Sequence, residues 1–344
     1  MKLALSGILF LILMFSCNSP SGESTEIRTI ITGQVSGYAE VSDHDMVKLL
    51  LTDPVSGNRE IITSLDSLGC FRFEPEVKYP REFVLNYSGH LHYFVYPGDS
   101  LHFEIDGKCW SKISESEAEE YAYYTLSGSD ESMGNHVAAF TAFFRDSLSD
   151  WLVLDSMVRA SDPMEFRAFI DKQTNERRGI SEVYIQAHSA SEDFADWASR
   201  KITLAGWGDL IMYCWLKPSR ENLERISFIQ SLPPEYLNFL DEWDREDREY
   251  LKSYDYEFFI SQYQMILDQL VPLDTQQYYQ DVMQQDFAQA AAYRPRYYSE
   301  AESGYTRDLL VANYYYRLLD AKYYNKIKHI IDTTLIADED ARAI

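Results

Sequence analysis

The residues of this chain with the most distinctive chemistry are its four cysteines, Cys17, Cys70, Cys109 and Cys214. A cysteine can accept a lipid, form a disulfide, bind a metal or attack another sulfur, and each role requires its own spacing or surroundings. No two cysteines have the Cys-x-x-Cys spacing of a dithiol redox motif. The flanking residues of each cysteine therefore decide which role it is expected to have.

Cys17 follows an apolar run, and this position predicts lipid attachment. Lys2 precedes a short apolar segment (residues 3–15), which is typical of a secretory signal peptide and too short to cross ~30 Å of hydrocarbon. The tetrad Met-Phe-Ser-Cys at 14–17 resembles the bacterial lipobox, whose cysteine is diacylated after the signal is cleaved. An ordinary cleavable signal beside an incidental cysteine is the alternative.

This pattern predicts a signal peptide over residues 1–16 and a lipidated, serine-rich tether over residues 17–26. Two acyl chains hold a protein on a membrane stably, whereas one chain is marginal. We therefore expect a cell-envelope protein whose contact with the membrane is its N-terminal lipid. Because no acidic run directly follows Cys17, the periplasmic face of the outer membrane is favoured.

The other three cysteines predict little chemistry. Cys70 and Cys109 could pair in an oxidising compartment, but a bridge needs a short Cα separation that sequence does not show. A Cys70–Cys109 disulfide and two free thiols both stay open. Cys214 lies in the apolar phrase "IMYCWL", which predicts a small buried side chain.

The charge of the chain excludes one class of function. It contains 31 Lys and Arg against 55 Asp and Glu, for a net charge of -24. Such a surface repels phosphate, so we expect no nucleic-acid partner. It also repels anionic lipid headgroups, so membrane association should depend on the acyl anchor.

Residues 27–110 have the alternating pattern of short strands. Leu101, Phe103 and Ile105 face one way, while the polar residues between them face the other. The turn-forming stretch at 53–58 lies between two apolar runs and predicts a hairpin. The pattern predicts an antiparallel β-sandwich of about seven strands.

A tight turn is predicted at the phrase "YPGDS", where Asp99 can bond to nearby backbone; a ligand contact through Asp99 is the alternative. His90, His92 and His102 lie on neighbouring strands, but they do not supply three or four converging ligands. We therefore predict neither a metal site nor a cofactor.

Residues 114–344 change to helical periodicity, so the predicted fold class is α+β, with the β-sandwich followed by an all-α domain. Asp162 is a predicted N-cap, with Pro163 at the first helical position. Gly206 and Gly208 predict a break between two helices, the second of which ends at Pro218.

No Gly-x-Ser-x-Gly, His-Glu-x-x-His or phosphate-binding-loop motif is present in the sequence, so we predict a non-enzyme. The acidic phrase "DEWDREDREY" is typical of an ion-paired surface. The aromatic residues Trp207, Trp215 and the run Tyr314–Tyr316 are expected to pack in the core; exposed, they could capture a glycan.

Several phrases together resemble one family. The lipobox, the β-rich stretch ending in "YFVYPGDSLHFEID", the phrase "LSGSDES" and the segment "LPPEYLNFLDEWDREDREYLKSYDYEFFISQY" are similar to the N-terminal part of TlpA-like thioredoxin-family envelope lipoproteins. The resemblance covers about residues 17–330 and implies a β-domain followed by helices. Those proteins also carry a C-terminal thioredoxin domain with a Cys-x-x-Cys dithiol, which we do not expect here.

Three hypotheses follow. The first is a non-catalytic, lipid-anchored accessory or binding module of the envelope, which corresponds to the non-thioredoxin part of TlpA-like proteins and has an envelope protein as its partner. The second is a lipoprotein that captures a ligand such as a glycan. The third is an enzyme whose site residues are dispersed along the chain and therefore form no linear motif.

Overall fold

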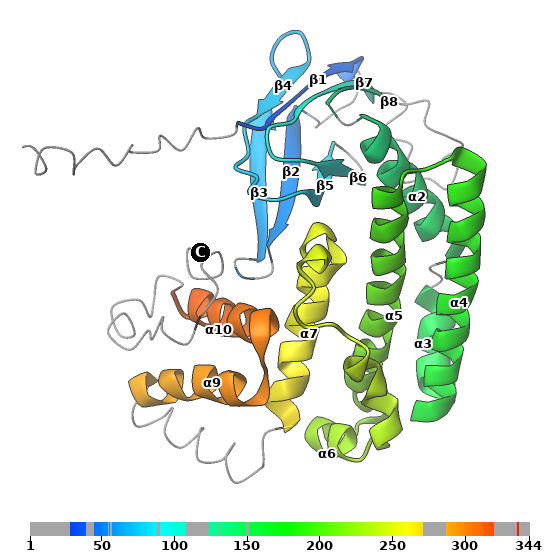
Figure 1. The fold of residues 1–344 in the computed structure, drawn as a ribbon, viewed down its shortest axis with the longest axis vertical. Coiled ribbons are helices and arrows are strands. Elements are labelled where there is room, and N and C mark those ends of the chain that lie inside the picture. The colour runs from blue at the N-terminus through cyan, green and yellow to red at the C-terminus, as the bar shows by residue number, and fades with distance from the viewer. Residues whose placement is uncertain are drawn as a thin grey trace, which may run out of the picture.

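The computed structural model consists of a β-rich part followed by helices, so the predicted mixed α+β class is confirmed (Figure 1). It describes residues 28–38, 45–53, 55, 57–87, 90–107, 124–129, 131–148, 151–270, 287–319 and 336. The predicted signal and tether, including Cys17, lie outside these residues, as does Cys109. None of the described helices is long and apolar enough to span a bilayer.

The described strands form two four-stranded sheets, with strand orders β4-β1-β7-β8 and β3-β2-β5-β6. Strand β2 pairs with β3 through Asp53 and Gly57, which confirms the predicted hairpin. Gly57 has φ +74, a left-handed conformation that suits glycine. The strands are β1 (Ile30–Ser36), β2 (Met46–Asp53), β3 (Gly57–Ser64), β4 (Cys70–Phe73), β5 (Arg81–Asn86), β6 (His90–Val95), β7 (Ser100–Asp106) and β8 (Tyr124–Gly128).

Two features of the sheets differ from the sequence prediction. β1 and β7 run parallel, although antiparallel pairing was expected. The sequence could not distinguish the two, because apolar residues alternate in the same way in parallel and antiparallel strands. β8 pairs with β7 although it lies beyond residue 110, where the β-rich part was expected to end. β8 has only five residues, and none is fully buried, so its alternation is weak.

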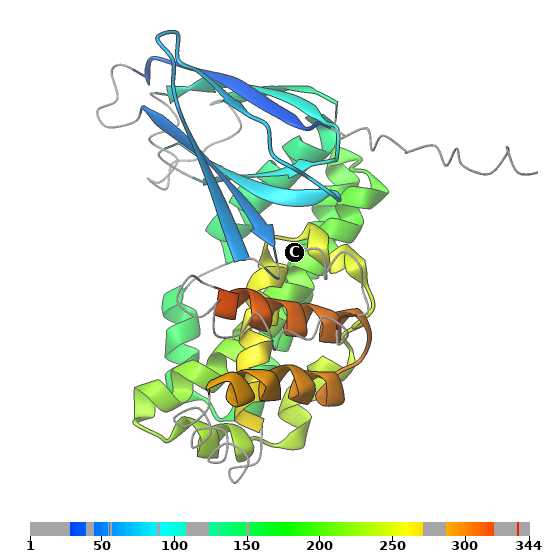
Figure 2. The same cartoon turned by 90° about the vertical axis from the view of Figure 1, so that its left-hand side faces the viewer.

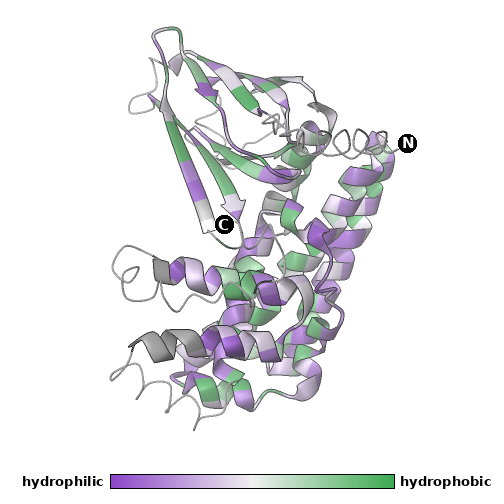
Figure 3. Cartoon of the chain, turned by 60° about the vertical axis from the view of Figure 1, so that its left-hand side comes forward, coloured by the Kyte–Doolittle hydropathy of each residue, from purple (hydrophilic) through white to green (hydrophobic). Residues whose placement is uncertain are grey.

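The alternating residues of the strands form an apolar core. Leu101, Phe103 and Ile105 are all buried, as their spacing predicts. They share one cluster with residues of the other sheet, including Leu49 and Leu85. Figure 3 shows the corresponding alternation of hydrophobic and hydrophilic residues along the strands.

The helical part begins with α2, which packs on β6, and continues with α4 and α5, which lie side by side (Figure 1). α9 and α10 lie side by side, with α10 the nearer of the two to the β2–β3 hairpin (Figure 2). The helices are α2 (Glu131–Leu148), α3 (Trp151–Ala160), α4 (Pro163–His188), α5 (Glu192–Glu221), α6 (Arg225–Gln230), α7 (Asp255–Leu270), α9 (Phe287–Ala301) and α10 (Gly304–Leu319), with 3₁₀ helices η2 (Pro234–Asp241) and η3 (Arg248–Lys252).

The predicted N-cap of α4 is confirmed, because the Asp162 carboxylate accepts a hydrogen bond from the Glu165 backbone N–H at 2.9 Å. The predicted break near Gly206 is wrong, since α5 runs unbroken through it. A Cβ on Gly206 would lie 2.5 Å from Oγ1 of Thr174 on α4. This glycine therefore allows two helices to pack closely instead of ending one.

The two parts of the molecule interlock through the β2–β3 hairpin. Val55, at its tip, is 2% exposed and belongs to the hydrophobic core of the helices. The Asn313 side chain on α10 donates a hydrogen bond to the Val55 carbonyl at 3.1 Å. The hairpin thus connects the second sheet to the last described helix.

Candidate functional site

A hollow of about 490 Å³ lies between β8, α2 and α4. This volume falls within the roughly 300–1,000 Å³ of known small-ligand pockets. We call it the aromatic hollow. Its lining residues are neutral or aromatic: Tyr124, Thr125 and Leu126 from β8, Asn135, His136 and Ala139 from α2, and Tyr184 and His188 from α4.

Regular helix spacing places the α2 and α4 residues in the hollow. Asn135 and Ala139 are four residues apart on α2, and Tyr184 and His188 are four apart on α4, so each pair lies on one helix face. α2 can approach the sheet closely because it carries Gly134, where a Cβ would lie 2.6 Å from the Tyr93 ring.

The rings of the hollow are packed against one another. The Tyr184 and His188 rings lie 4.3 Å apart with their planes 30° apart, so His188 covers Tyr184. The His136 ring meets Tyr184 edge-on at 6.0 Å. Tyr124 meets Tyr93 edge-on at 5.7 Å. The packing fixes the rings in place, which is a property of preformed binding sites.

Polar groups in the hollow are partly engaged within the chain. The Asn135 Oδ1 accepts a hydrogen bond from the Tyr93 hydroxyl at 3.1 Å, and the His136 Nδ1 lies 3.2 Å from the Tyr184 hydroxyl. The pKa of His136 is lowered by its burial and then by His188. His136 is therefore an uncharged imidazole at neutral pH.

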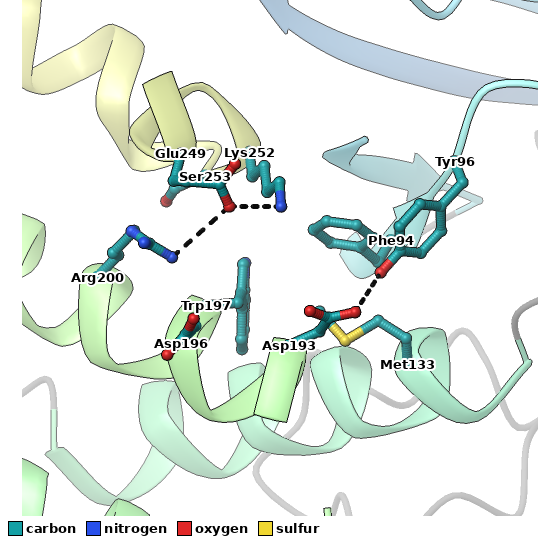
Figure 4. Close-up of a pocket in the computed structure, with 10 residues that line it drawn as sticks. All are labelled: Phe94, Tyr96, Met133, Asp193, Asp196, Trp197, Arg200, Glu249, Lys252 and Ser253. Atoms are coloured by element: carbon teal, nitrogen blue, oxygen red, sulfur yellow. Dashed lines mark hydrogen bonds and ion pairs between the residues drawn. The ribbon is translucent and has the colours of Figure 1, made fainter. Parts of the chain in front are cut away.

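A second depression, the crevice, lies where α5, η3, α2 and β6 meet (Figure 4). Its volume is about 10 Å³, which is room for about one water molecule. Phe94, Met133 and Trp197 are buried beneath it. The buried Trp197 Nε1 has no hydrogen-bond partner among the described residues, so a water in the crevice would be a suitable acceptor.

Three of the charged side chains around the crevice, Arg200, Glu249 and Lys252, are paired with one another. Glu249 accepts from Lys252 at 2.5 Å and lies 3.9 Å from Arg200. The Tyr96 hydroxyl lies 3.5 Å from the Asp193 carboxylate, and Figure 4 shows these pairs as dashed lines. Because the crevice is nearly filled and Arg200, Glu249 and Lys252 in its lining pair with one another, it is a joint between elements and not a ligand pocket.

A buried ionic cluster joins the second sheet to the helices. Lys201 Nζ on α5 lies 3.2 Å from Glu82 Oε1 on β5 and 2.8 Å from Asp255 Oδ2 on α7. His92 Nδ1 on β6 lies 2.6 Å from the same Glu82 oxygen. The Tyr254 backbone N–H donates to the other Glu82 oxygen at 3.1 Å. The Glu82 side chain is 0% exposed, so the cluster compensates its buried charge.

The pKa values in this cluster favour the charged forms. Burial alone would raise the pKa of Glu82, but Lys201 and His92 outweigh it and hold that pKa below its ordinary value. Burial alone would lower the pKa of Lys201, but Asp255 and Glu82 raise it instead. A lysine held as ammonium is a poor nucleophile, so the geometry points to a structural role.

The residues predicted from sequence do not come together at one place. Asp99 is 6% exposed, and its carboxylate accepts hydrogen bonds from the Tyr96 backbone N–H and the Ser129 hydroxyl. Asp99 thus holds the predicted turn together. Cys70 is half-buried and forms no disulfide with another described residue, and its pairing with Cys109 stays a prediction because Cys109 lies outside the described residues.

The predicted burial is confirmed for Cys214, Trp207, Trp215 and Tyr315 and is wrong for Tyr316. Cys214 is 0% exposed, Trp207 8% and Trp215 9%, so they pack in the helical core. Tyr315 is also buried, whereas Tyr316 is 42% exposed. Within the described residues, no three His, Cys, Asp or Glu side chains converge as metal ligands.

The residues of the aromatic hollow were not recognised in the sequence. The spacing of Tyr184 and His188 on one helix face was a usable signal. Their proximity to Tyr124 and His136, however, depends on the packing of α4 against α2 and the sheet, which no local pattern encodes.

Comparison of the chain with models of protein families, with curated proteins and with solved structures finds no match.

Proposed function

We propose that this chain is a non-catalytic, lipid-anchored envelope protein that acts as a binding module through the aromatic hollow. The observation that carries the proposal is a pocket of about 490 Å³ whose rings are held in place by packing. Small-ligand sites are concave, largely apolar and preformed, with a few polar groups for orientation. The hollow has these properties.

The state of the reactive groups supports a non-catalytic role. Burial raises the pKa of the Cys214 thiol to about 12, and a neutral buried thiol is inert. Lys201 is held as ammonium by two carboxylates.

The anchor and the location are proposed from sequence. Cys17 would carry the lipid, and the body would lie at the periplasmic face of the outer membrane. We also propose that the two sheets form a β-sandwich, because one apolar cluster contains residues of both sheets. We further propose, from the sequence resemblance, that the body corresponds to the non-thioredoxin part of TlpA-like proteins. An accessory role beside an envelope protein is the second form of the proposal, and the resemblance supports it.

The anchor is tested by labelling cells that express the chain with radioactive palmitate and then fractionating them. We expect label in the wild-type protein and none in Cys17→Ser, which should leave the membrane fraction. Cys70→Ser is the matched control and should stay labelled. A labelled, membrane-bound Cys17→Ser variant would contradict the anchor.

The binding site is tested by filling it. Ala139→Phe places a ring in the hollow, and Ala187→Phe, on an exposed position of α4, is the control. A library of small envelope metabolites is screened by thermal shift with the full chain in detergent. Ligands that raise the melting temperature of wild type and Ala187→Phe should leave that of Ala139→Phe unchanged. Equal increases in melting temperature in all three proteins would refute the site.

A further inference from the structure

We propose that the aromatic hollow binds an uncharged sugar, either alone or as one residue of an oligosaccharide. This inference rests on the proposed function and names the ligand class of the same site. It uses three properties of the lining residues: their charge, their exposed rings and their remaining hydrogen-bonding groups.

The charge of the site selects against ionic ligands. None of the residues that line the hollow is an acid, a lysine or an arginine, and His136 is neutral because burial lowers its pKa. An anion would meet no cation there to offset the repulsion of a chain with net charge -24. A metal ion or ammonium group would meet no carboxylate in the lining.

The rings of the site provide a flat surface and not a cage. Tyr184 is covered by His188 and also packs against Phe140 and Phe194 at 5.5 and 5.6 Å. It therefore lacks the open faces with which several rings surround a quaternary ammonium group. The exposed His188 and the half-buried Tyr124 form the accessible rings, and the C–H face of a pyranose can lie flat against such a ring.

The polar groups of the site match hydroxyl groups. The Asn135 Oδ1 is engaged by Tyr93, which leaves its side-chain NH₂ without an acceptor among the described residues. The His136 Nδ1 faces Tyr184, so Nε2 is the nitrogen that can meet a ligand. Amide and imidazole groups bond to hydroxyls, which both donate and accept. A ring with one apolar face and a rim of hydroxyls fits this arrangement.

The test uses the full lipidated chain in detergent and saturation-transfer NMR with isothermal titration. The probes are maltotriose, cellotriose, mannotriose and galactobiose, with a glucuronic acid disaccharide and choline as charged probes. Asn135→Ala and His188→Ala each remove one proposed contact at an exposed position. Gln186→Ala, exposed on the same helix, is the matched control.

We expect at least one neutral probe to bind saturably and neither charged probe to bind. Asn135→Ala and His188→Ala should each raise Kd about threefold to tenfold, the loss of one hydrogen bond or ring contact; Gln186→Ala should not change it. Urea unfolding of each variant shows whether the fold is kept.

Two results would overturn the inference, and only the second would also overturn the proposed binding site. If choline or the charged disaccharide binds with the same variant pattern, the hollow is a binding site but its ligand is not a neutral sugar. If no probe binds and Ala139→Phe also leaves every library ligand unaffected, the proposed binding site falls as well.

Discussion

The buried ionic cluster allows one prediction to be worked out in detail: the effect of Lys201→Met. Lys201 neutralises a Glu82 side chain that is 0% exposed and lies 3.2 Å away. Removing one partner of a buried ion pair costs about 3–5 kcal/mol, because the remaining charge is buried without compensation. His92 lies 2.6 Å from Glu82, so this contact to the Glu82 carboxylate remains when Lys201 is removed. We therefore expect a loss of about 3 kcal/mol at pH 7.

The same contacts also set how the stability depends on pH. The folded-state pKa of Glu82 is lowered from 4.5 to about 2, and 2.5 units correspond to about 3 kcal/mol. Because the folded pKa is below the unfolded value, this stability is fully present above about pH 4.5 and is lost as the pH falls towards 2. The difference in stability between wild type and Lys201→Met should therefore narrow by about half or more between pH 5 and pH 3 and close only near pH 2.

The assay is urea unfolding followed by tryptophan fluorescence and circular dichroism at pH 7, 5 and 3. Lys172→Met is the matched control: the Lys172 side chain is 76% exposed and lies 3.8 Å from Glu176, so it should lose less than about 0.5 kcal/mol. The double variant Glu82→Gln/Lys201→Met should lose less than the two single variants together. The reasoning would be refuted if the unfolding free energies of wild type and Lys201→Met differed by less than about 1 kcal/mol at pH 7, or if their difference were as large at pH 3 as at pH 7.

Three further predictions concern separate parts of the molecule. Asn313→Ala should cost about 1–3 kcal/mol in urea unfolding, because it leaves the buried Val55 carbonyl unpaired; an unchanged midpoint would contradict the interlock. Cys214 should resist iodoacetamide at pH 8 in the folded protein and react in urea, since burial raises its thiol pKa to about 12; alkylation without urea would contradict its burial. The carboxyl of Asp209 should titrate near pH 6 in carbon NMR, because burial raises its pKa to about 6 in spite of Arg177. Since this folded pKa exceeds the unfolded value, ionisation of Asp209 should lower the stability of the fold as the pH rises from about 4 to 6. Titration of this carboxyl near pH 4 would contradict its burial.

Local patterns predicted the elements whose cause is local. The alternation of Leu101, Phe103 and Ile105 is set by the strand itself, and the Asp162 cap involves only the first turn of α4. The hairpin after Asp53 likewise depends on adjacent residues. Each of these features is decided within a few residues.

Long-range packing overrode local signals elsewhere. Gly206 normally weakens a helix, but in α5 it lets Thr174 of α4 approach, so the helix continues. The acidic phrase around Asp247 is ion-paired as predicted, with Arg200 at 3.4 Å from its carboxylate. Trp243, within the same phrase, is however buried in the helical core.

The sequence alone determined the mixed α+β class and the order of strands before helices, because both are recorded in composition and short-range periodicity; a lipid at Cys17 stays a prediction from sequence. Only the tertiary structure brought Tyr124, His136 and Tyr184 to one hollow, and Glu82 beside Lys201, which lies 119 positions further along the chain. Contacts between distant segments depend on which faces pack together. That choice is made by the whole core, so no single stretch of the chain reveals it.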